Sequence, residues 1–207
     1  MKNFIQKNIP LLNQTNFFTN YQSTKFITGK ILHLDGDKKY SQKAYNYYNK
    51  MGLNAIVRNI TESNQPFVVY RLLKIYFPDI LIITGHDAML KRNSDYYNLY
   101  NYRNSKYFIE TIKQARKFDT NFNCNTTIFA GACESYFEAL ISAGANFASS
   151  PKRILIDFMD PLVVAQKVAC TETNKYITID DLVPNLRDGK KGVDGIGSSG
   201  KMRKQVL

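Results

Sequence analysis

Short, continuously apolar segments alternate along this chain with longer segments whose apolar residues recur every three or four positions. The clearest apolar segment is DILIITGHD, residues 79–87, and a helix-like segment follows it over residues 104–118. Strands without a polar face are covered on both sides, and helices between them connect parallel strands. The pattern therefore predicts an α/β fold, a three-layer α-β-α sandwich around a mostly parallel sheet.

The expected elements define one domain with an extension at each end. Strands are predicted at residues 29–37, 54–59, 79–87, 126–133, 153–158 and 176–182. Helices are predicted at residues 38–51, 65–77, 104–118, 135–143 and 161–169. We expect the domain to span residues 29–186, after an N-terminal linker or partial N-terminal region at 1–28. Residues 187–207 are rich in Gly, Ser and Lys and carry six basic and two acidic side chains, which predicts a flexible basic tail.

Composition narrows the classes of protein that the chain can belong to. Of its 207 residues, 44% are hydrophobic, which is too apolar for a disordered chain. No apolar run approaches the roughly 20 residues of a membrane span, and the first residues show no secretory signal. The three cysteines suggest a reducing compartment, so we expect a cytoplasmic protein without a metal or cofactor. The net charge of +11 suits acidic partners, but the basic residues are scattered, which does not favour nucleic acid.

Side chains of catalytic type stand where three of the predicted strands end. Because the carboxyl ends of parallel strands meet at one edge of a sheet, functional residues gather there. The residues concerned are His33, Asp35 and Asp37 from the first strand, His86 and Asp87 from the third, and Cys133 and Glu134 from the fourth.

Cys133 and His86 are the candidates for nucleophilic catalysis. Cys133 follows two small residues at a strand-to-helix junction, where a substrate can approach and the helix N-terminus favours a thiolate. His86 follows an apolar strand and could exchange a proton near neutral pH. It precedes Cys133 by 47 residues, which is close to the spacing found in caspases. Each residue also has a structural interpretation, a buried cysteine and a hydrogen-bonded histidine at a strand end.

Several longer motifs, in order along the chain, resemble one protein family. DILIITGHD and IFAGAC resemble the catalytic strands of the caspase, gingipain and clostripain superfamily of cysteine peptidases. With HLDGD, YRNSKYFIETIKQAR and AGANFASSPKRILI they resemble, over roughly residues 29–183, the YabG family of sporulation-specific proteases. The resemblance implies a caspase-like endopeptidase that processes spore coat and related spore proteins after arginine. It also implies a mother-cell cytoplasmic protein that becomes associated with the spore coat.

The resemblance implies roles for individual residues. Cys133 would be the nucleophile and His86 the general base and then the acid, in a dyad that requires no metal. The oxyanion would be held by the backbone N–H of Cys133 and of either Asp87 or Gly85. Near the end of the first strand, two carboxylates would bind the substrate's arginine: Asp35 and Asp37. The same DGD sequence also has the form of a solvated turn.

Two residues depart from the family pattern. Asp87 stands where a small residue usually follows the histidine, and it could orient His86 or meet a cationic substrate. Glu134 stands where we expect glutamine, and its charge would disfavour a thiolate beside it or serve in substrate binding. Asp157 and Asp160 are weaker candidates for substrate binding.

Three alternatives start from the same residues. Nucleophile-elbow amidotransferases are excluded because their histidine follows the cysteine, and no histidine follows Cys133. HLDGD also has the form of a haloacid-dehalogenase phosphatase motif, with Asp35 as nucleophile and Asp37 as acid beside magnesium, but the usual threonine is missing. A basic chain with 14 tyrosines could instead be a non-enzymatic spore-coat scaffold. Arg187 and Arg203, in the predicted tail, are candidate sites of self-cleavage.

Overall fold

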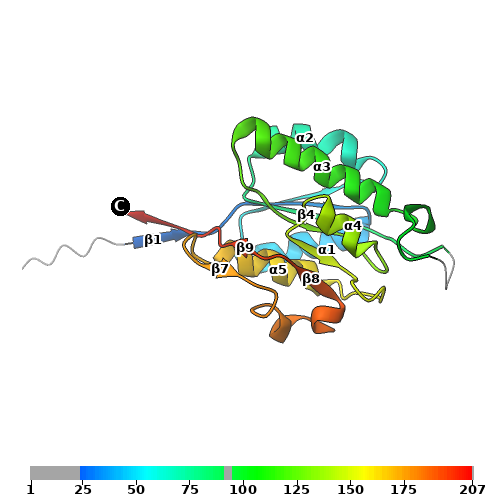
Figure 1. The fold of residues 1–207 in the computed structure, drawn as a ribbon. Coiled ribbons are helices and arrows are strands. Elements are labelled where there is room, and N and C mark those ends of the chain that lie inside the picture. Colours follow the sequence, from blue (N-terminus) through cyan, green and yellow to red (C-terminus); the bar gives the residue numbers. More distant parts are fainter. Residues whose placement is uncertain (1–23, 91–94, 207) are drawn as a thin grey trace, which may run out of the picture.

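A six-stranded sheet forms the centre of the computed structural model, which describes residues 24–90 and 95–206 (Figure 1). Its strand order is β3-β2-β4-β5-β6-β8. The first five strands run parallel to one another, and β8 is antiparallel to β6. The strands are β2 (Ile31–Asp35), β3 (Ala55–Asn59), β4 (Ile80–Thr84), β5 (Thr127–Ala130), β6 (Phe147–Ser149) and β8 (Val193–Gly195). The predicted, mostly parallel sheet is confirmed.

Helices cover both faces of this sheet, as Figure 1 shows. One face packs against α2 (Gln65–Tyr76), α3 (Ser105–Phe122) and the short α4 (Phe137–Ser142). The other face packs against α1 (Lys38–Lys50) and α5 (Met159–Cys170). The three-layer α/β sandwich predicted from the sequence is therefore confirmed.

The burial of β4 explains why this strand is a continuous apolar run in the sequence. Ile80 and Ile82 belong to the hydrophobic core on the side of α1 and α5, whereas Leu81 and Ile83 belong to the core beneath α2 and α3. All four residues are at most 1% exposed. Because both faces of β4 are buried, its residues from Ile80 to Ile83 are all apolar, and polar residues begin at Thr84, where the strand ends.

The predicted strand at 153–158 is wrong, and that segment is a loop. Ser150 and Arg153 have backbone φ angles of 64° and 54°, in the left-handed region that interrupts an extended strand. Leu155 is 66% exposed, so the apolar run does not enter the core. The strand in this part of the sheet is instead the three-residue β6, which ends before the loop.

The predicted flexible tail at 187–207 is also wrong over residues 187–206. Strand β8 lies in the central sheet, β9 (Ser198–Ser199) pairs with β7 (Tyr176–Ile177), and β10 (Arg203–Val206) pairs with β1 (Thr24–Ile27). The glycines that suggested flexibility permit close packing instead. A Cβ on Gly195 would lie 2.2 Å from the carbonyl oxygen of Asn146, and one on Gly200 2.2 Å from that of Thr171.

The N-terminal end differs from the expected linker in one respect. Residues 24–27 form β1, whereas the rest of the linker predicted at 1–28, up to residue 23, lies outside the described residues. Three short 3-10 helices complete the fold: Leu99–Asn101, Val183–Asn185 and Gly189–Lys191. Within residues 24–90 and 95–206, no helix is long and apolar enough to cross a membrane.

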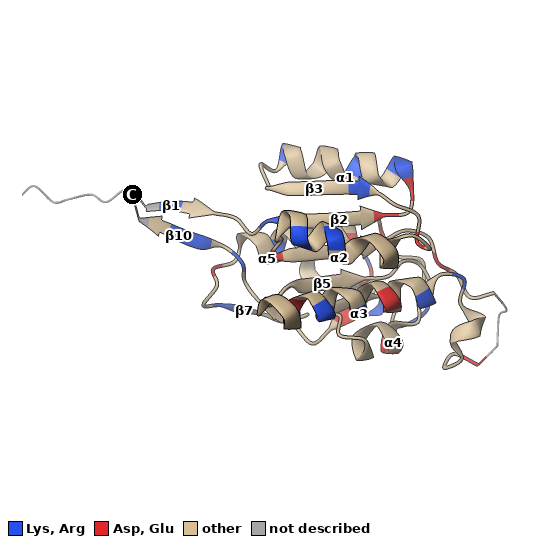
Figure 2. Cartoon of the chain, turned by 90° about the horizontal axis from the view of Figure 1, so that it is seen from above, with Lys and Arg blue, Asp and Glu red and all other residues tan. Residues whose placement is uncertain are grey.

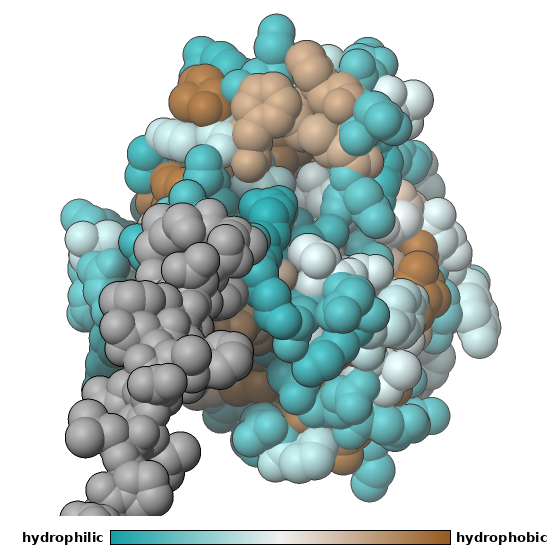
Figure 3. Space-filling model, turned by 90° about the vertical axis from the view of Figure 1, so that its left-hand side faces the viewer, coloured by the Kyte–Doolittle hydropathy of each residue, from teal (hydrophilic) through white to brown (hydrophobic). Residues whose placement is uncertain are grey.

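Charged and apolar residues are distributed unevenly over the surface. Figure 2 shows basic residues scattered over several elements, whereas acidic residues follow the carboxyl end of β2. The opposite end of the molecule, seen in Figure 3, is mainly hydrophilic, with apolar side chains gathered over the ends of α2 and α3. Phe77 and Phe122, which belong to these helix ends, are 51% and 39% exposed. Most of the predicted site residues belong to the other edge, where the carboxyl end of β2 lies.

Candidate active site

A pocket at the carboxyl edge of the sheet brings His86 and Cys133 together. His86 follows β4, Cys133 follows β5, and these two strands are parallel neighbours. Asp35 at the end of β2 also lines the pocket, and the loop at 156–158 forms another part of its wall. The expectation that strand ends would converge here rested on parallel pairing alone.

Asp37 is the carboxylate that holds the His86 ring. Oδ2 of Asp37 lies 2.9 Å from Nε2 of His86, whose side chain is 58% exposed. Oδ1 of the same carboxylate accepts hydrogen bonds from the backbone N–H groups of Lys39 and Tyr40, at 2.7 and 3.0 Å, in the first turn of α1. One residue thus begins the helix and orients the imidazole, because its two oxygens point to different partners.

The ionisation of Asp37 fits this arrangement. Its hydrogen bond with His86, and next the one from the N–H of Tyr40, hold the pKa of the carboxyl below its ordinary value. The carboxylate is therefore charged at neutral pH. With Nε2 of His86 facing Asp37, the other ring nitrogen, Nδ1, is the atom left to exchange a proton in the pocket.

Asp87 points elsewhere, although it is next to His86 in the sequence. Its carboxylate is buried and accepts hydrogen bonds from the N–H groups of Ala88 and Asn104 and from the hydroxyls of Ser105 and Ser135. Burial raises the pKa of Asp87, against the opposing effect of these hydrogen bonds. The structure places this carboxylate neither against the His86 ring nor in the pocket, so it braces the two loops behind the site.

Cys133 lies in a turn rather than at a helix N-terminus. The side chain is half-buried, and α4 begins only at Phe137, two residues later than predicted. Glu134 has a φ of 53°, and its carboxylate accepts a hydrogen bond from the N–H of Met89 at 3.2 Å. That contact ties Glu134 to the loop after His86, and Glu134 does not line the pocket.

Asp35 supplies negative charge to the pocket. It is 4% exposed, and its oxygens accept hydrogen bonds from the N–H of Asp37 and the hydroxyl of Thr84, both at 2.7 Å. Burial raises its pKa, but hydrogen bonding and attraction from His33, with the other two hydrogen bonds, outweigh burial and lower it. His33 is itself buried, contacts Thr84 and the hydroxyl of Tyr48, and also lines the pocket.

A second carboxylate, Asp157, lines the same pocket. Its Oδ2 lies 3.6 Å from a guanidinium nitrogen of Arg187, and its Oδ1 accepts a hydrogen bond from the N–H of Met159. Asp160 is buried, accepts hydrogen bonds from the N–H groups of Asp157 and Arg187, and does not line the pocket. The sequence ranked Asp157 below Asp37, but the structure places Asp157 in the wall of the pocket.

Backbone N–H groups around the pocket fall into two kinds. The N–H of His86 donates to Oε1 of Glu62 at 2.6 Å. Within the described ranges, the N–H groups of Gly85, Asp87 and Cys133 have no protein acceptor. These three are the groups available to bind a negatively charged oxygen.

Sequence reasoning missed Glu62 and the orienting role of Asp37. Glu62 lies in the loop between β3 and α2, a segment without a recognisable motif. The signal that could have suggested Asp37 was its place directly before α1, because a capping carboxylate keeps one oxygen free. In the part of the chain that the structure describes, no three His, Cys, Asp or Glu side chains are placed to hold a metal ion.

The sequence of the whole chain decides its family. The model of YabG peptidase U57 matches residues 3–207. The chain belongs to the YabG peptidase family. The sporulation-specific protease YabG of Bacillus subtilis (strain 168) is 42% identical over 175 residues, which cover 84% of this chain and 60% of that relative. The chain therefore spans about 60% of the length of this YabG relative.

Among solved structures, the chain is similar to two receiver domains. The receiver domain of the Francisella response regulator 1452 has a TM-score of 0.42 and 16% identity, covering 67% of this chain and 94% of that one. The receiver domain of the histidine kinase CKI1 from Arabidopsis thaliana, complexed with Mg²⁺, has a TM-score of 0.37 and 16% identity, covering 56% of this chain and 79% of that one.

Proposed function

We propose that this chain is a sporulation-specific cysteine endopeptidase that uses Cys133 as nucleophile and His86 as general base and acid. The observation that carries the proposal is the common pocket of these two side chains, with the ring of His86 bonded to Asp37. Membership of the YabG peptidase family and the similarity to the sporulation-specific protease YabG of Bacillus subtilis support peptide hydrolysis.

The geometry suits the usual sequence of steps in thiol catalysis. His86 takes the proton of the Cys133 thiol, and the thiolate attacks the peptide carbonyl carbon. The N–H of Cys133, with that of Gly85 or Asp87, stabilises the resulting oxyanion. His86 then gives its proton to the leaving amine, and water hydrolyses the thioester to release the acid and restore the thiol. Asp37 stabilises the imidazolium that exists between the two proton transfers.

We propose that cleavage follows arginine and that Asp35 binds its side chain. A guanidinium pairs best with a fixed carboxylate, and Asp35 is charged and held by two hydrogen bonds in the pocket. Asp157 adds a second carboxylate to the wall. Asp37 does not line the pocket and is bonded to His86, which leaves the arginine to Asp35. Spore coat and related spore proteins, met in the mother cell and at the coat, are the proposed substrates.

The decisive experiment compares purified wild type with Cys133→Ala and His86→Ala on fluorogenic peptides ending in arginine, lysine or citrulline. We expect only the wild type to cleave, with arginine preferred. An alkylating probe should label Cys133 ahead of Cys124 and Cys170, and burial raises the pKa of both of the latter thiols. Equal behaviour of all three proteins would contradict the proposal.

The same proteins decide the alternatives. Phosphatase activity that survives Cys133→Ala would favour the aspartate-based phosphatase, and unchanged spore-coat assembly in that variant would favour a scaffold.

A further inference from the structure

Polar contacts from three separate segments hold His86 in place. Its side chain is 58% exposed, and the ring of Tyr40 lies edge-on to it, at 6.1 Å between the ring centroids. Asp37 binds Nε2, Asn104 donates to the backbone carbonyl at 2.7 Å, and Glu62 accepts from the backbone N–H at 2.6 Å. The Glu62 contact has no part in the mechanism described above.

The carboxylate of Glu62 lies in a space that two glycines leave open. A Cβ added to Gly36, after β2, or to Gly85, after β4, would lie 2.2 Å from Oε1 of Glu62. Any larger residue at either position would displace the carboxylate. The two strand-end loops of the site therefore provide the space from which Glu62 reaches the N–H of His86.

The loop that carries Glu62 is fixed to the same strand end. Gln65 is fully buried at the start of α2, and its Nε2 donates to the carbonyl oxygens of Ile60 and Thr84, at 3.1 and 2.9 Å. Glu62 and Gln65 thus hold the chain on both sides of Gly85. A carboxylate makes a shorter and stronger hydrogen bond to a backbone N–H than a neutral acceptor does, so on a fixed loop it defines the position of that N–H.

We propose that Glu62 is a positioning residue for His86, an inference that rests on the proposed function. Its carboxylate fixes the backbone of His86, whose side chain lines the same pocket as Cys133. It also occupies the N–H of His86, so that the N–H groups of Gly85, Asp87 and Cys133 remain as the donors for the oxyanion. Glu62 touches neither substrate nor thiol in this role.

Replacing Glu62 in the full chain tests the inference through catalysis. We expect Glu62→Ala to lower kcat by about 10- to 100-fold with KM within about twofold, because misplacing a catalytic group by about 1 Å has this effect. Glu62→Gln keeps an acceptor oxygen at the same reach and should stay within about threefold of wild type. Glu110→Ala is the matched control, since Glu110 is an exposed glutamate that contacts only Gln114 among the described side chains.

A second variant separates positioning from a loss of folding. Gly36→Ala should expel the carboxylate and lower kcat as Glu62→Ala does, and the double variant should lose little more, because both changes break one contact. Wild-type kcat in a folded Glu62→Ala protein would overturn the inference. Equal losses in Glu62→Ala and Glu62→Gln that follow their melting temperatures would also overturn it.

A direct measurement of the histidine keeps this inference distinct from the proposed function. In NMR spectra of the full chain, the His86 ring resonances of Glu62→Ala should shift and broaden relative to wild type, whereas those of Glu110→Ala should not. If wild type cleaves no peptide, the proposed function fails, and these spectra still decide whether Glu62 positions His86. Identical His86 spectra in wild type and Glu62→Ala would overturn the inference.

Discussion

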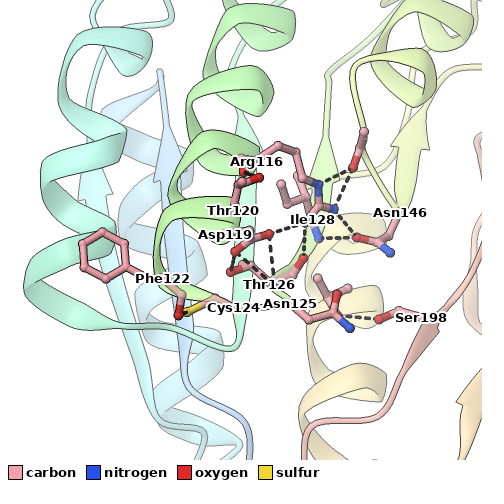
Figure 4. A network of polar contacts seen from close by, with 12 residues as sticks. Arg116, Asp119, Thr120, Phe122, Cys124, Asn125, Thr126, Ile128, Asn146 and Ser198 are labelled. Atoms are coloured by element: carbon pink, nitrogen blue, oxygen red, sulfur yellow. Dashed lines mark hydrogen bonds and ion pairs between the residues drawn. The ribbon is translucent and has the colours of Figure 1, made fainter.

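The two edges of the central sheet use polar residues in opposite ways. At the amino edge, Arg116 of α3 donates to the carboxylate of Asp119, to the carbonyls of Thr126 and Gly144, and to the side chain of Asn146 (Figure 4). Asp119 in turn accepts from the N–H and hydroxyl of Thr126. All three guanidinium nitrogens of Arg116 therefore have acceptors among the described residues.

At the carboxyl edge, several polar groups have hydrogen-bonding positions that no described residue fills. The His86 ring has one hydrogen-bonding partner, Asp37, and the N–H groups of Gly85 and Cys133 have no acceptor within residues 24–90 and 95–206. Polar groups whose hydrogen bonds are all made within the chain hold loops in place. Polar groups in a pocket that lack a partner are able to bind a substrate. The difference suggests that stability and the proposed chemistry depend on opposite ends of the same strands, and single substitutions can test that separation.

The largest expected effect is on the stability of the amino edge. Arg116→Ala leaves the carbonyls of Thr126 and Gly144 without this donor and Asp119 without its charged partner, which costs about 3 kcal/mol for a partly buried pair. The melting temperature should fall by about 6–12 °C for a chain of this size. Thermal unfolding followed by circular dichroism measures the loss, and peptidase activity per folded molecule at low temperature should not change. A larger loss of activity than of folded protein would show that the two edges are coupled.

Asp37→Asn should weaken the carboxyl edge without unfolding it. Asparagine caps a helix as well as aspartate does, so the start of α1 should survive while the imidazolium of His86 loses its charged partner. We expect kcat to fall by about 10- to 100-fold, or about 1.4–2.8 kcal/mol. Asp37→Ala is the companion variant, and it should lose about 1 kcal/mol of stability as well because the cap is gone. An Asp37→Asn enzyme with wild-type kcat would refute the orienting role.

Asp35→Asn should change the substrate preference rather than the rate of the chemical step. Loss of the pocket charge should lower kcat/KM for an arginyl peptide by about tenfold, or about 1.4 kcal/mol. The matched citrullinyl peptide, which is neutral, should be affected much less. Asp157→Asn is the comparison variant, since that carboxylate is already near Arg187. If Asp157→Asn alone changes the preference for arginine, the binding role belongs to Asp157.

The smallest effect concerns pH and stability at Asp37. Its pKa in the folded protein lies below the ordinary value of 3.8. The carboxylate therefore stabilises the fold above that value, and the contribution is lost as the pH falls through the folded pKa. The difference in unfolding free energy between wild type and Asp37→Asn should be constant near neutral pH and shrink in acid. Denaturant titrations at several pH values measure it, and a difference that grows in acid would contradict the assignment.

The sequence predicted the fold best where burial left the chain no alternative. Strands β2, β4 and β5 read as apolar runs because both faces are covered, and α1 and α2 were found within one residue of their bounds. It failed where sheet structure depends on distant pairing. Strand β8 lies in a glycine-rich segment whose pairing with β6 has no local signal. The apolar residues within 153–158 predicted a strand wrongly, because Arg153 adopts a left-handed conformation that interrupts extended structure.

The sequence predicted which residues lie near the pocket better than it predicted where their side chains point. Strand ends identified His86, Cys133 and Asp35, since parallel pairing alone brings them to one edge. Because Asp87 follows His86 in the sequence, it was a candidate to orient the histidine. Its buried carboxylate instead accepts a hydrogen bond from the hydroxyl of Ser135. Asp37, which follows β2, binds the ring of His86, which follows the neighbouring strand β4. Its place directly before α1 was an indirect sign of this contact.

The ribbon of β1 and β10 has a consequence for how this chain folds. Thr24 pairs with Val206, so the ribbon joins the two ends of the described chain, and Figure 1 shows it projecting away from the sheet. Closing so long a loop has the highest entropic cost in the molecule, and an isolated pair of strands is only marginally stable. The ribbon should therefore form last in folding and open first, while the sheet that carries Cys133 and His86 stays closed.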